Sequence, residues 1–343
     1  KELIEQPILS IKDLFTEANY PLHGSLSKNW MLPTALGTLR PTCLAPETMI
    51  NGDLSTHNRN RCYLLVGFSK FVDFYPELAA DNLRALGYNT KAVTLDVPSL
   101  RSRHFVTGRV LAESFDRYEL ISEISELLRP HLSGVDVIGF PAVLGIRHPL
   151  QVKSKFEQVL GCPIFEIPTL PPSIPGIRMQ QIFLKAIENN GGRVTEGMQV
   201  TGAQFKDRKI SQVFSEAAAR YKSHSAKCFV LASGGFLGGG FISNSHGYAQ
   251  DTAMSLGLHL PVDHLDWFDK EFLSSSGHPV FKAGFPVNSK FQPLENDDLL
   301  FDNLYLTATS LPGYDPLQER SLEGVALVSG FSIAKYVAQS HTH

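Results

Sequence analysis

The sequence predicts an α/β fold built around a parallel sheet. Two continuous apolar runs, Cys62–Gly67 and Val135–Phe140, are typical of strands that are buried on both faces. Apolar residues recur at helical spacing in Tyr75–Leu86 and Glu119–Leu128, and Thr90–Leu95 returns as a strand between these two helices. Strands that alternate with helices indicate a parallel sheet with helices on its faces.

Length and composition are those of an ordinary globular protein. A chain of 343 residues, 43% hydrophobic and 19% charged, is long enough for two domains or for one large fold with an insertion. Its 31 basic and 34 acidic residues leave a net charge of -3, so nucleic-acid binding is not expected. No stretch approaches the run of about 20 apolar residues that spans a bilayer, so any membrane contact is expected to be peripheral.

The cysteines indicate neither a metal site nor an iron–sulfur cluster. Cys43, Cys62, Cys162 and Cys228 stand apart, without a C-x-x-C pair and without histidines at zinc-ligand spacing. Their distribution fits small buried thiols in a reduced, cytoplasmic protein.

The middle of the chain has a different character. Four prolines between Ile167 and Arg178 predict a stiff connection without regular helix or strand, followed by a helix from about Met179 to Asn189. The segment Arg193–Phe214 is typical of an antiparallel meander. Earlier in the chain, Trp30–Pro41 mixes turn formers with apolar residues and predicts an ordered loop with a short strand.

A strand that runs into glycines is the first candidate site. Lys227–Ala232 predicts a buried strand, which continues directly into Ser233–Gly240. Ligands of open α/β sheets gather beyond the carboxyl ends of strands, and glycines let a backbone approach a cofactor closely. Ser233, Gly234, Gly235 and Phe236 are therefore candidate cofactor contacts. The glycine spacing matches neither G-x-G-x-x-G nor a G-K-[ST] phosphate loop, so a tight structural loop remains the alternative.

A second candidate lies near the carboxyl end, where Phe301–Thr309 predicts a strand and a helix is expected to begin near Glu323. The unsatisfied amides of a helix start suit an anion or a polarised carbonyl. The alternative is one more strand–helix pair of the sheet. The candidate cofactor contacts in this strand, turn and first helical turn are Thr309, Gly313, Asp315, Pro316, Gly324 and Val325.

Four segments, taken in order, carry a resemblance to a known family over essentially the whole chain. They are PTALGTLRPT (33–42), PTLPPSIPGIR (168–178), FVLASGGFLGGG (229–240) and NLYLTATSLPGYDP (303–316). The chain resembles the anaerobic glycerol-3-phosphate dehydrogenase B subunits, and LASGGF also looks like a flavin contact of fumarate reductase relatives. This resemblance implies a Rossmann-like FAD/NAD(P)-binding fold interrupted by an inserted α/β substrate or cap domain.

The resemblance also implies a division of the chain. We expect residues 1–173 to be mainly the inserted cap domain, residues 174–240 and 299–343 to be the flavin-binding domain, and residues 241–298 to be the return segment of the cap. The family's chains open with a strand and a glycine-rich phosphate loop, and nothing comparable occurs in Lys1–Leu39. The expectation is an incomplete Rossmann-like fold, truncated at the amino terminus, without its first strand and phosphate loop.

The expected cofactor is FAD or FMN. Two positions depart from the family's pattern: Glu319–Gly324 replaces a glycine-rich run, and Ala308 follows the strand where the family usually has glycine. The side chains of Arg320, Leu322 and Glu323 leave open a protein that has lost its flavin.

The function implied by the resemblance is oxidation of sn-glycerol 3-phosphate to dihydroxyacetone phosphate, with electrons passing through flavin toward a membrane quinone. The implied partners within the same complex are the catalytic A subunit, together with the iron–sulfur membrane-anchor C subunit. The chain is then cytoplasmic, peripheral at the inner face of the cell membrane, and inactive alone. Alternatives are a related flavoprotein with another substrate and a non-catalytic structural or electron-transfer subunit.

A phosphate-bearing substrate favours arginine, whose planar fork binds phosphate oxygens in pairs. Arg40 and Arg178 lie in the two proline-containing motifs and are the candidate substrate or anion contacts, with a surface or structural ion pair as the alternative. No histidine falls in a recognisable motif, so no catalytic base is assigned.

Overall fold

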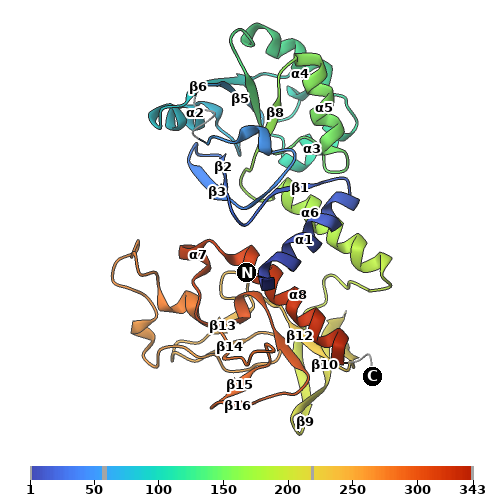
Figure 1. Cartoon of the computed structure of the whole chain (residues 1–343), viewed down its shortest axis with the longest axis vertical. Helices are drawn as coiled ribbons and strands as arrows, with labels where there is room; N and C mark the ends of the chain where they lie inside the picture. Colours follow the sequence, from blue (N-terminus) through green and yellow to red (C-terminus); the bar gives the residue numbers. More distant parts are fainter. Residues whose placement is uncertain (1, 56–59, 218–219, 341–343) are drawn as a thin grey trace. The chain divides into compact units, whose positions relative to one another are not determined.

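The structure, a computed structural model, describes residues 2–55, 60–217 and 220–340 (Figure 1). The chain divides into two compact units: unit 1 comprises Lys1–Ile8 and Thr195–His343, and unit 2 comprises Leu9–Val194. The sequence predicted that the cap domain ends at residue 173, whereas the boundary between the compact units lies between Val194 and Thr195. The functional assignment of each segment stays a prediction.

Unit 2 is built on a four-stranded parallel sheet with the strand order β6-β5-β7-β8. Every residue of β5 and β7 is buried, which explains why these two strands are continuous apolar runs. The predicted α/β fold with a parallel sheet is confirmed. The strands of the sheet are β5 (Cys62–Phe68), β6 (Asn89–Leu95), β7 (Val137–Pro141) and β8 (Ile164–Ile167).

Helices cover both faces of this sheet, α2 on one side and α3, α4 and α5 on the other (Figure 1). This arrangement follows from right-handed crossovers, because the chain moves in one direction from β5 to β6 and in the other from β6 to β8. The helices are α2 (Pro76–Ala85), α3 (Gly108–Asp116), α4 (Ile121–Leu128) and α5 (Pro149–Leu160).

The strand order reverses between β5 and β7, the point at which open α/β sheets usually bind ligands. Apolar side chains meet near this point in unit 2. A Cβ atom built on Gly108 would lie 3.6 to 3.7 Å from side-chain carbons of Val143, Ile174 and Phe71.

The amino-terminal part of the chain forms a helix and two short strand pairs. The strands β2 and β3 pair antiparallel from Trp30↔Thr42 to Pro33↔Leu39, where a loop with one short strand was predicted. Helix α1 spans the boundary between the two units. The elements are α1 (Glu2–Glu17), β1 (Leu22–Gly24), β2 (Trp30–Pro33), β3 (Leu39–Thr42) and β4 (Leu44–Pro46).

The proline-rich segment requires a correction. Prolines were expected to exclude regular structure up to Arg178, but helix α6 (Ile174–Asn189) already begins at Ile174. Pro175 lies in the first turn, where its missing N–H is not needed, and the Ser173 hydroxyl caps the helix by accepting from Gly176 N at 3.1 Å. Arg178 is therefore a helical residue.

Unit 1 combines an antiparallel meander, a parallel strand pair and a long carboxyl-terminal helix. The meander β11-β10-β9 confirms the predicted antiparallel arrangement, but its strands run from Val200 to His224 and not from Arg193 to Phe214. Strand β12 pairs in parallel with β17 from Phe229↔Leu304 to Leu231↔Leu306. Leu231, Leu304 and Leu306 of the parallel strand pair belong to the same hydrophobic core as Ile210 and Val213 of the meander. The strands are β9 (Val200–Lys206), β10 (Lys209–Ala217), β11 (Arg220–His224), β12 (Phe229–Leu231), β13 (Phe241–Ser243), β14 (Ala249–Asp251), β15 (Leu294–Glu295), β16 (Asp298–Leu299) and β17 (Leu304–Leu306).

Two helices follow β17. They are α7 (Pro316–Glu319) and α8 (Leu322–Ser340), and α8 begins one residue before the predicted start. Within the described ranges no helix is both long and apolar enough to cross a membrane, no two cysteines form a disulfide, and no group of His, Cys, Asp or Glu side chains could hold a metal ion.

Candidate cofactor site

A cavity of about 300 Å³ opens in unit 1 beside the segments that follow the two parallel strands. The loop after β12 forms one wall, and the turn after β17 together with the first residue of α8 forms another. The cavity is lined by Gly234, Gly235, Phe236, Leu237, Gly238, Phe241, Val280, Phe281, Ala283, Thr309, Pro316, Leu317 and Leu322. The structure thus brings together candidates from two separate motifs.

The glycine loop presents bare backbone to this cavity because it folds tightly onto itself. Gly240 N donates to Gly235 O at 3.0 Å, and a Cβ atom on Gly240 would clash with the carbonyl oxygen of Gly234. Gly234 itself has φ of +89°, a left-handed conformation that glycine adopts without strain. A Cβ atom on Gly235 would lie 3.3 Å from Cβ of Thr309 across the cavity wall. A residue with a side chain at Gly234 or Gly240 would therefore change the backbone conformation of the loop.

The end of β17 is fastened to α8 by hydroxyl groups. The Thr307 and Ser329 hydroxyls lie 2.7 Å apart, and Ala308 N donates to the Ser329 hydroxyl at 3.2 Å. Ala308 has φ of +54°, so it occupies a left-handed conformation at the position where the resembled family usually has glycine. Helix α8 therefore holds the turn that carries Thr309.

Two buried hydroxyls border the cavity-lining residues and have no hydrogen-bond partner within the described parts of the chain. They belong to Ser233, which precedes Gly234, and to Ser310, which follows Thr309. Buried polar groups are nearly always satisfied, so an orphaned hydroxyl beside a cavity indicates a polar ligand or an ordered water. Ser233 was predicted from the glycine motif, whereas Ser310 was missed because serine in a turn carries no distinctive signal.

The remaining candidates of the carboxyl-terminal motif have mainly structural positions. The buried Asp315 carboxylate caps α7 by accepting from Leu317 N at 2.9 Å and Gln318 N at 3.2 Å. Gly313 N donates to Lys282 O at 3.0 Å. Gly324 and Val325 do not line the cavity, although Leu322 in the same helical turn does. Of this motif, Thr309 and Pro316 reach the cavity.

Arg178 has a different environment from the one predicted. Its side chain is 2% exposed and forms a bidentate ion pair with the fully buried Glu166, at 2.6 and 2.8 Å. Its remaining bonds go to Gly145 O at 2.8 Å and the Tyr20 hydroxyl at 3.1 Å. Burial alone would lower the pKa of Arg178, but the Glu166 carboxylate more than offsets this and raises it. Arg178 is a structural ion pair of unit 2, the alternative reading, and we no longer consider it a substrate contact.

Arg40 lies exposed on β3 in unit 2, paired in register with Leu32. No contact in the structure assigns it to substrate or cofactor, so its role stays a prediction.

The lining of the cavity is mainly apolar and contains no acid or base. Aromatic and aliphatic side chains line it, glycines leave one wall flat, and hydroxyls border it, which suits a planar ring with polar edges. None of the lining residues is titratable. Its volume of about 300 Å³ is at the lower end of the roughly 300–1,000 Å³ typical of small-molecule sites, too small for a whole dinucleotide.

Comparisons with known proteins identify the family to which the chain belongs. A family model described as FAD binding domain matches residues 11–306. The chain is 26% identical to the B subunit of the anaerobic glycerol-3-phosphate dehydrogenase of Aliivibrio fischeri, over 99% of this chain and 78% of that protein. It is 27% identical to the same subunit of Mannheimia succiniciproducens, over 97% of this chain and 79% of that protein. The probable B subunit of this dehydrogenase from Halobacterium salinarum is 28% identical, over 91% of this chain and 74% of that protein. No solved structure matches the chain.

Proposed function

Because the chain belongs to the family of FAD-binding domains, we propose that it is the flavin-binding B subunit of an anaerobic glycerol-3-phosphate dehydrogenase. The relatives with this name support the assignment along nearly the whole chain. The structural observation that carries it is the cavity beside β12 and β17, walled by glycine backbone and bordered by two orphaned hydroxyls. FAD is the cofactor of this family, so FMN is no longer needed as an alternative.

Each part of the site has a role in holding the ring. Phe236, Phe241 and Leu322 exclude water from it, and the backbone of the glycine loop approaches its face. The buried hydroxyls of Ser233 and Ser310 adjoin the lining residues Gly234 and Thr309 in sequence, and polar atoms at the ring's edge would supply the partner that they lack. The chemistry that FAD supplies when bound is acceptance of the two electrons released as the C2 alcohol of sn-glycerol 3-phosphate becomes a ketone.

The proposal includes partners and a location. The relatives are named as one lettered member of a larger enzyme, which implies companions. We assign these as the catalytic A subunit, together with an iron–sulfur C subunit that anchors the complex and passes electrons to quinone. The chain is then cytoplasmic and peripheral at the inner face of the membrane. In this scheme residues 1–173 act as the cap, and residues 174–240 and 299–343 hold the flavin. Residues 241–298 return from the cap and add Phe241, Val280, Phe281 and Ala283 to the cavity lining.

One observation favours a second candidate, an electron-transfer or structural subunit. No titratable side chain lines the cavity, so no group there can accept the proton of the substrate hydroxyl. In that case this protein binds flavin and relays electrons while substrate is oxidised in the A subunit.

The test measures FAD first and turnover second. The purified chain is examined for the visible absorption of flavin, and the extracted cofactor is identified by chromatography. Gly238→Leu adds a side chain at the cavity wall, where a Cβ atom meets only ordinary contacts at 3.6 Å or more, and should abolish bound FAD. Gly202→Leu on β9 is the control, since Gly202 lies outside the cavity and its nearest contact would be 3.9 Å. Wild-type protein without flavin, or equal loss in both variants, would contradict the proposal.

Turnover separates the two candidates. Dye reduction that depends on glycerol 3-phosphate is measured for the assembled complex and for the isolated A subunit. Loss of the reaction only when the B subunit is omitted or carries Gly238→Leu supports a role in the oxidation itself. Unchanged dye reduction by the isolated A subunit, with loss of quinone reduction, supports the electron-transfer role.

A further inference from the structure

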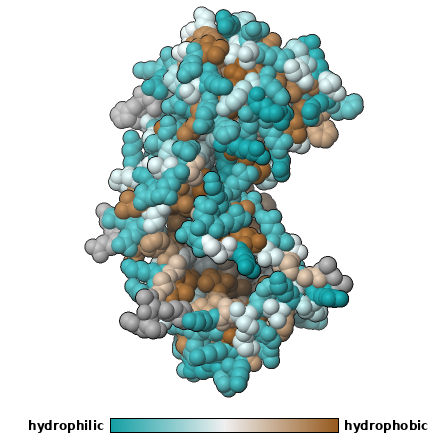
Figure 2. Space-filling view, turned by 90° about the vertical axis from the view of Figure 1, so that its right-hand side faces the viewer, coloured by the Kyte–Doolittle hydropathy of each residue, from teal (hydrophilic) through white to brown (hydrophobic). Residues whose placement is uncertain are grey.

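Large apolar side chains are exposed along one loop of unit 1. We call residues 262–273 the apolar loop. Its exposed members are Val262 (101%), Leu265 (73%), Phe268 (57%), Phe272 (87%) and Leu273 (87%). Single exposed apolar residues are common, and Figure 2 shows many brown patches among the teal hydrophilic surface, but five within one short loop are unusual.

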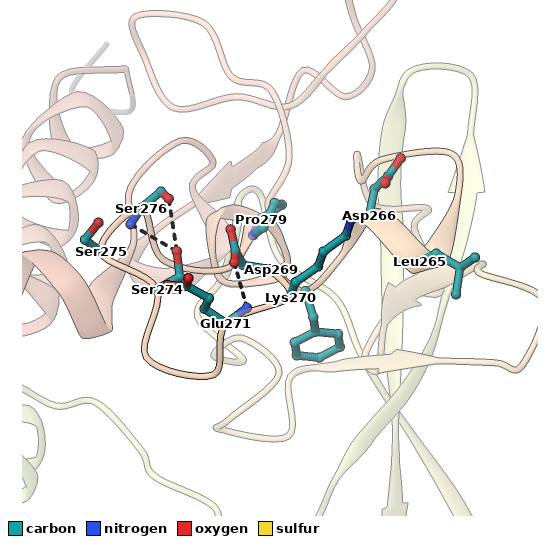
Figure 3. Close-up of a pocket in the computed structure, with 10 residues that line it drawn as sticks. Leu265, Asp266, Asp269, Lys270, Glu271, Ser274, Ser275, Ser276 and Pro279 are labelled. Carbon is teal, nitrogen blue, oxygen red and sulfur yellow. Dashed lines mark hydrogen bonds between the residues drawn. The ribbon is translucent and has the colours of Figure 1, made fainter.

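The backbone of the apolar loop is fixed, so the exposed side chains are held outward. Trp267 is only 6% exposed, packs with Ala249 and Val280, and donates its indole N–H to Pro261 O at 3.0 Å. The Asp269 carboxylate accepts from Glu271 N at 2.9 Å, as drawn in Figure 3, where Leu265 points away from the other labelled residues. A loop that is already ordered loses little conformational entropy when it binds.

The apolar loop is also attached to both walls of the cofactor cavity. The ring centroids of Trp267 and Phe236 lie 6.2 Å apart, and Phe236 belongs to the glycine wall. On the other side, Gln318 of α7 donates to Ser274 O at 2.9 Å, directly after the loop. A partner on the apolar loop would therefore bind to a segment that packs against Phe236 of the cavity lining.

The negative charge of the apolar loop indicates which kind of partner it can bind. The apolar loop carries Asp263, Asp266, Asp269 and Glu271 against a single Lys270, a net charge of -3. An anionic lipid surface repels such a loop, because basic and not acidic segments are attracted to it. A symmetric contact between two copies of this chain would place two such loops against each other. A protein surface with an apolar groove and a basic rim would complement both the exposed apolar side chains and the negative charge of the apolar loop.

We propose that the apolar loop is the docking surface for a companion subunit that offers an apolar groove bordered by lysine and arginine. Phe272 and Leu273 are its anchors, since large side chains buried at the centre of an interface carry most of its binding energy. The acidic side chains steer and orient the partner. The identity of the partner rests on the proposed function, whereas the chemistry of the surface does not.

Co-purification tests the anchors. The chain is co-expressed with tagged A and C subunits, and the fraction retained with them is measured. Phe272→Ser with Leu273→Ser should lower retention at least tenfold. The matched control is Phe105→Ser with Leu170→Ser, because these residues of unit 2 are comparably exposed at 65% and 64%; it should keep wild-type retention. Equal retention of both double variants overturns the inference.

Charge reversal gives a second measurement. Asp266→Lys with Glu271→Lys should slow association and remove its dependence on salt, since the two side chains are exposed and not part of the fold's core. In a chain labelled with 5-fluorotryptophan, the fluorine resonance of Trp267 should shift when unlabelled companions are added, and should not shift in the Phe272→Ser, Leu273→Ser variant. An unshifted wild-type resonance in a formed complex overturns the inference.

The other occupants and the proposed function are tested separately. Sedimentation of the wild type, but not of the Phe272→Ser, Leu273→Ser variant, with phosphatidylglycerol vesicles overturns the inference in favour of a membrane. A dimer seen by light scattering and lost in that variant overturns it in favour of a second copy. If wild-type chain binds no companion, the docking proposal and the heteromeric assignment both fail, and bound FAD then shows whether the flavin site stands.

Discussion

The substitution Arg178→Met removes a cation that four hydrogen bonds hold inside unit 2. Glu166 then keeps only the bond from Leu144 N, at 2.8 Å, in a position where its side chain is fully buried. Removing one partner of a buried ion pair costs about 3–5 kcal/mol, because an uncompensated charge remains. This is a large share of the roughly 5–15 kcal/mol by which folded domains are stable.

The expected loss translates into a change that is easily measured. For a domain of this size, each kcal/mol lowers the melting temperature by about 2–4 °C, so Arg178→Met should lower that of unit 2 by roughly 6–20 °C. Adding Glu166→Leu removes the orphaned carboxylate and should restore part of the stability. The Leu144 amide then lacks its acceptor, which costs about 1–3 kcal/mol.

The assay is chemical and thermal unfolding of the whole chain, followed by circular dichroism, with bound FAD measured in parallel. Arg101→Met is the matched control, because Arg101 and Asp96 form an exposed pair at 2.9 Å with side chains 59% and 55% exposed. It should cost no more than about 1 kcal/mol. Unchanged unfolding of Arg178→Met together with lost ligand binding would refute the structural role and restore the anion-contact hypothesis.

Three further substitutions test local geometry. Ala308→Gly relieves the left-handed conformation at φ of +54° and should stabilise unit 1 by about 0.5–1 kcal/mol in urea unfolding; a lower midpoint contradicts this. Burial raises the pKa of Tyr63 from 10.0 to about 12, so its contribution to stability is complete below pH 10 and is lost as the pH rises through about 12. Tyr63→Phe should reduce that alkaline decline in stability by about 3 kcal/mol, and an unchanged decline opposes the assignment. Gly240→Ala clashes with Gly234 O and should cost unit 1 about 1–3 kcal/mol and its FAD; full FAD content would show that the loop tolerates a Cβ atom.

The parallel sheet of unit 2 could be predicted because burial leaves a direct mark on the sequence. Strands β5 and β7 are covered on both faces, so polar residues are excluded and the runs are unbroken. The start of α6 could not be predicted from proline content alone, since a proline in the first helical turn and a proline that ends a helix look the same without the cap of Ser173.

The site was predictable where backbone geometry demands a particular residue. The fold of the loop after β12 requires glycine at Gly234 and Gly240, and Gly234, Gly235 and Gly238 line the cavity. Val280, Phe281 and Ala283 were missed, because apolar residues from a distant segment carry no mark that separates a cavity wall from an ordinary core. Arg178 misled for a related reason: nothing in the sequence shows that its carboxylate partner is buried beside it.

The two units differ in continuity along the chain, and this sets an order of events during translation. Unit 2 is one uninterrupted segment, Leu9–Val194, whereas most of unit 1 is made afterwards, from Thr195 onward. Domains fold as units as they leave the ribosome. The cofactor cavity, in contrast, is formed by segments on both sides of the apolar loop. Strand β12 precedes the loop in the sequence, whereas β17 and Leu322 follow it. If this cavity binds FAD as proposed, flavin loading requires that β12, β17 and the start of α8 have all been synthesised.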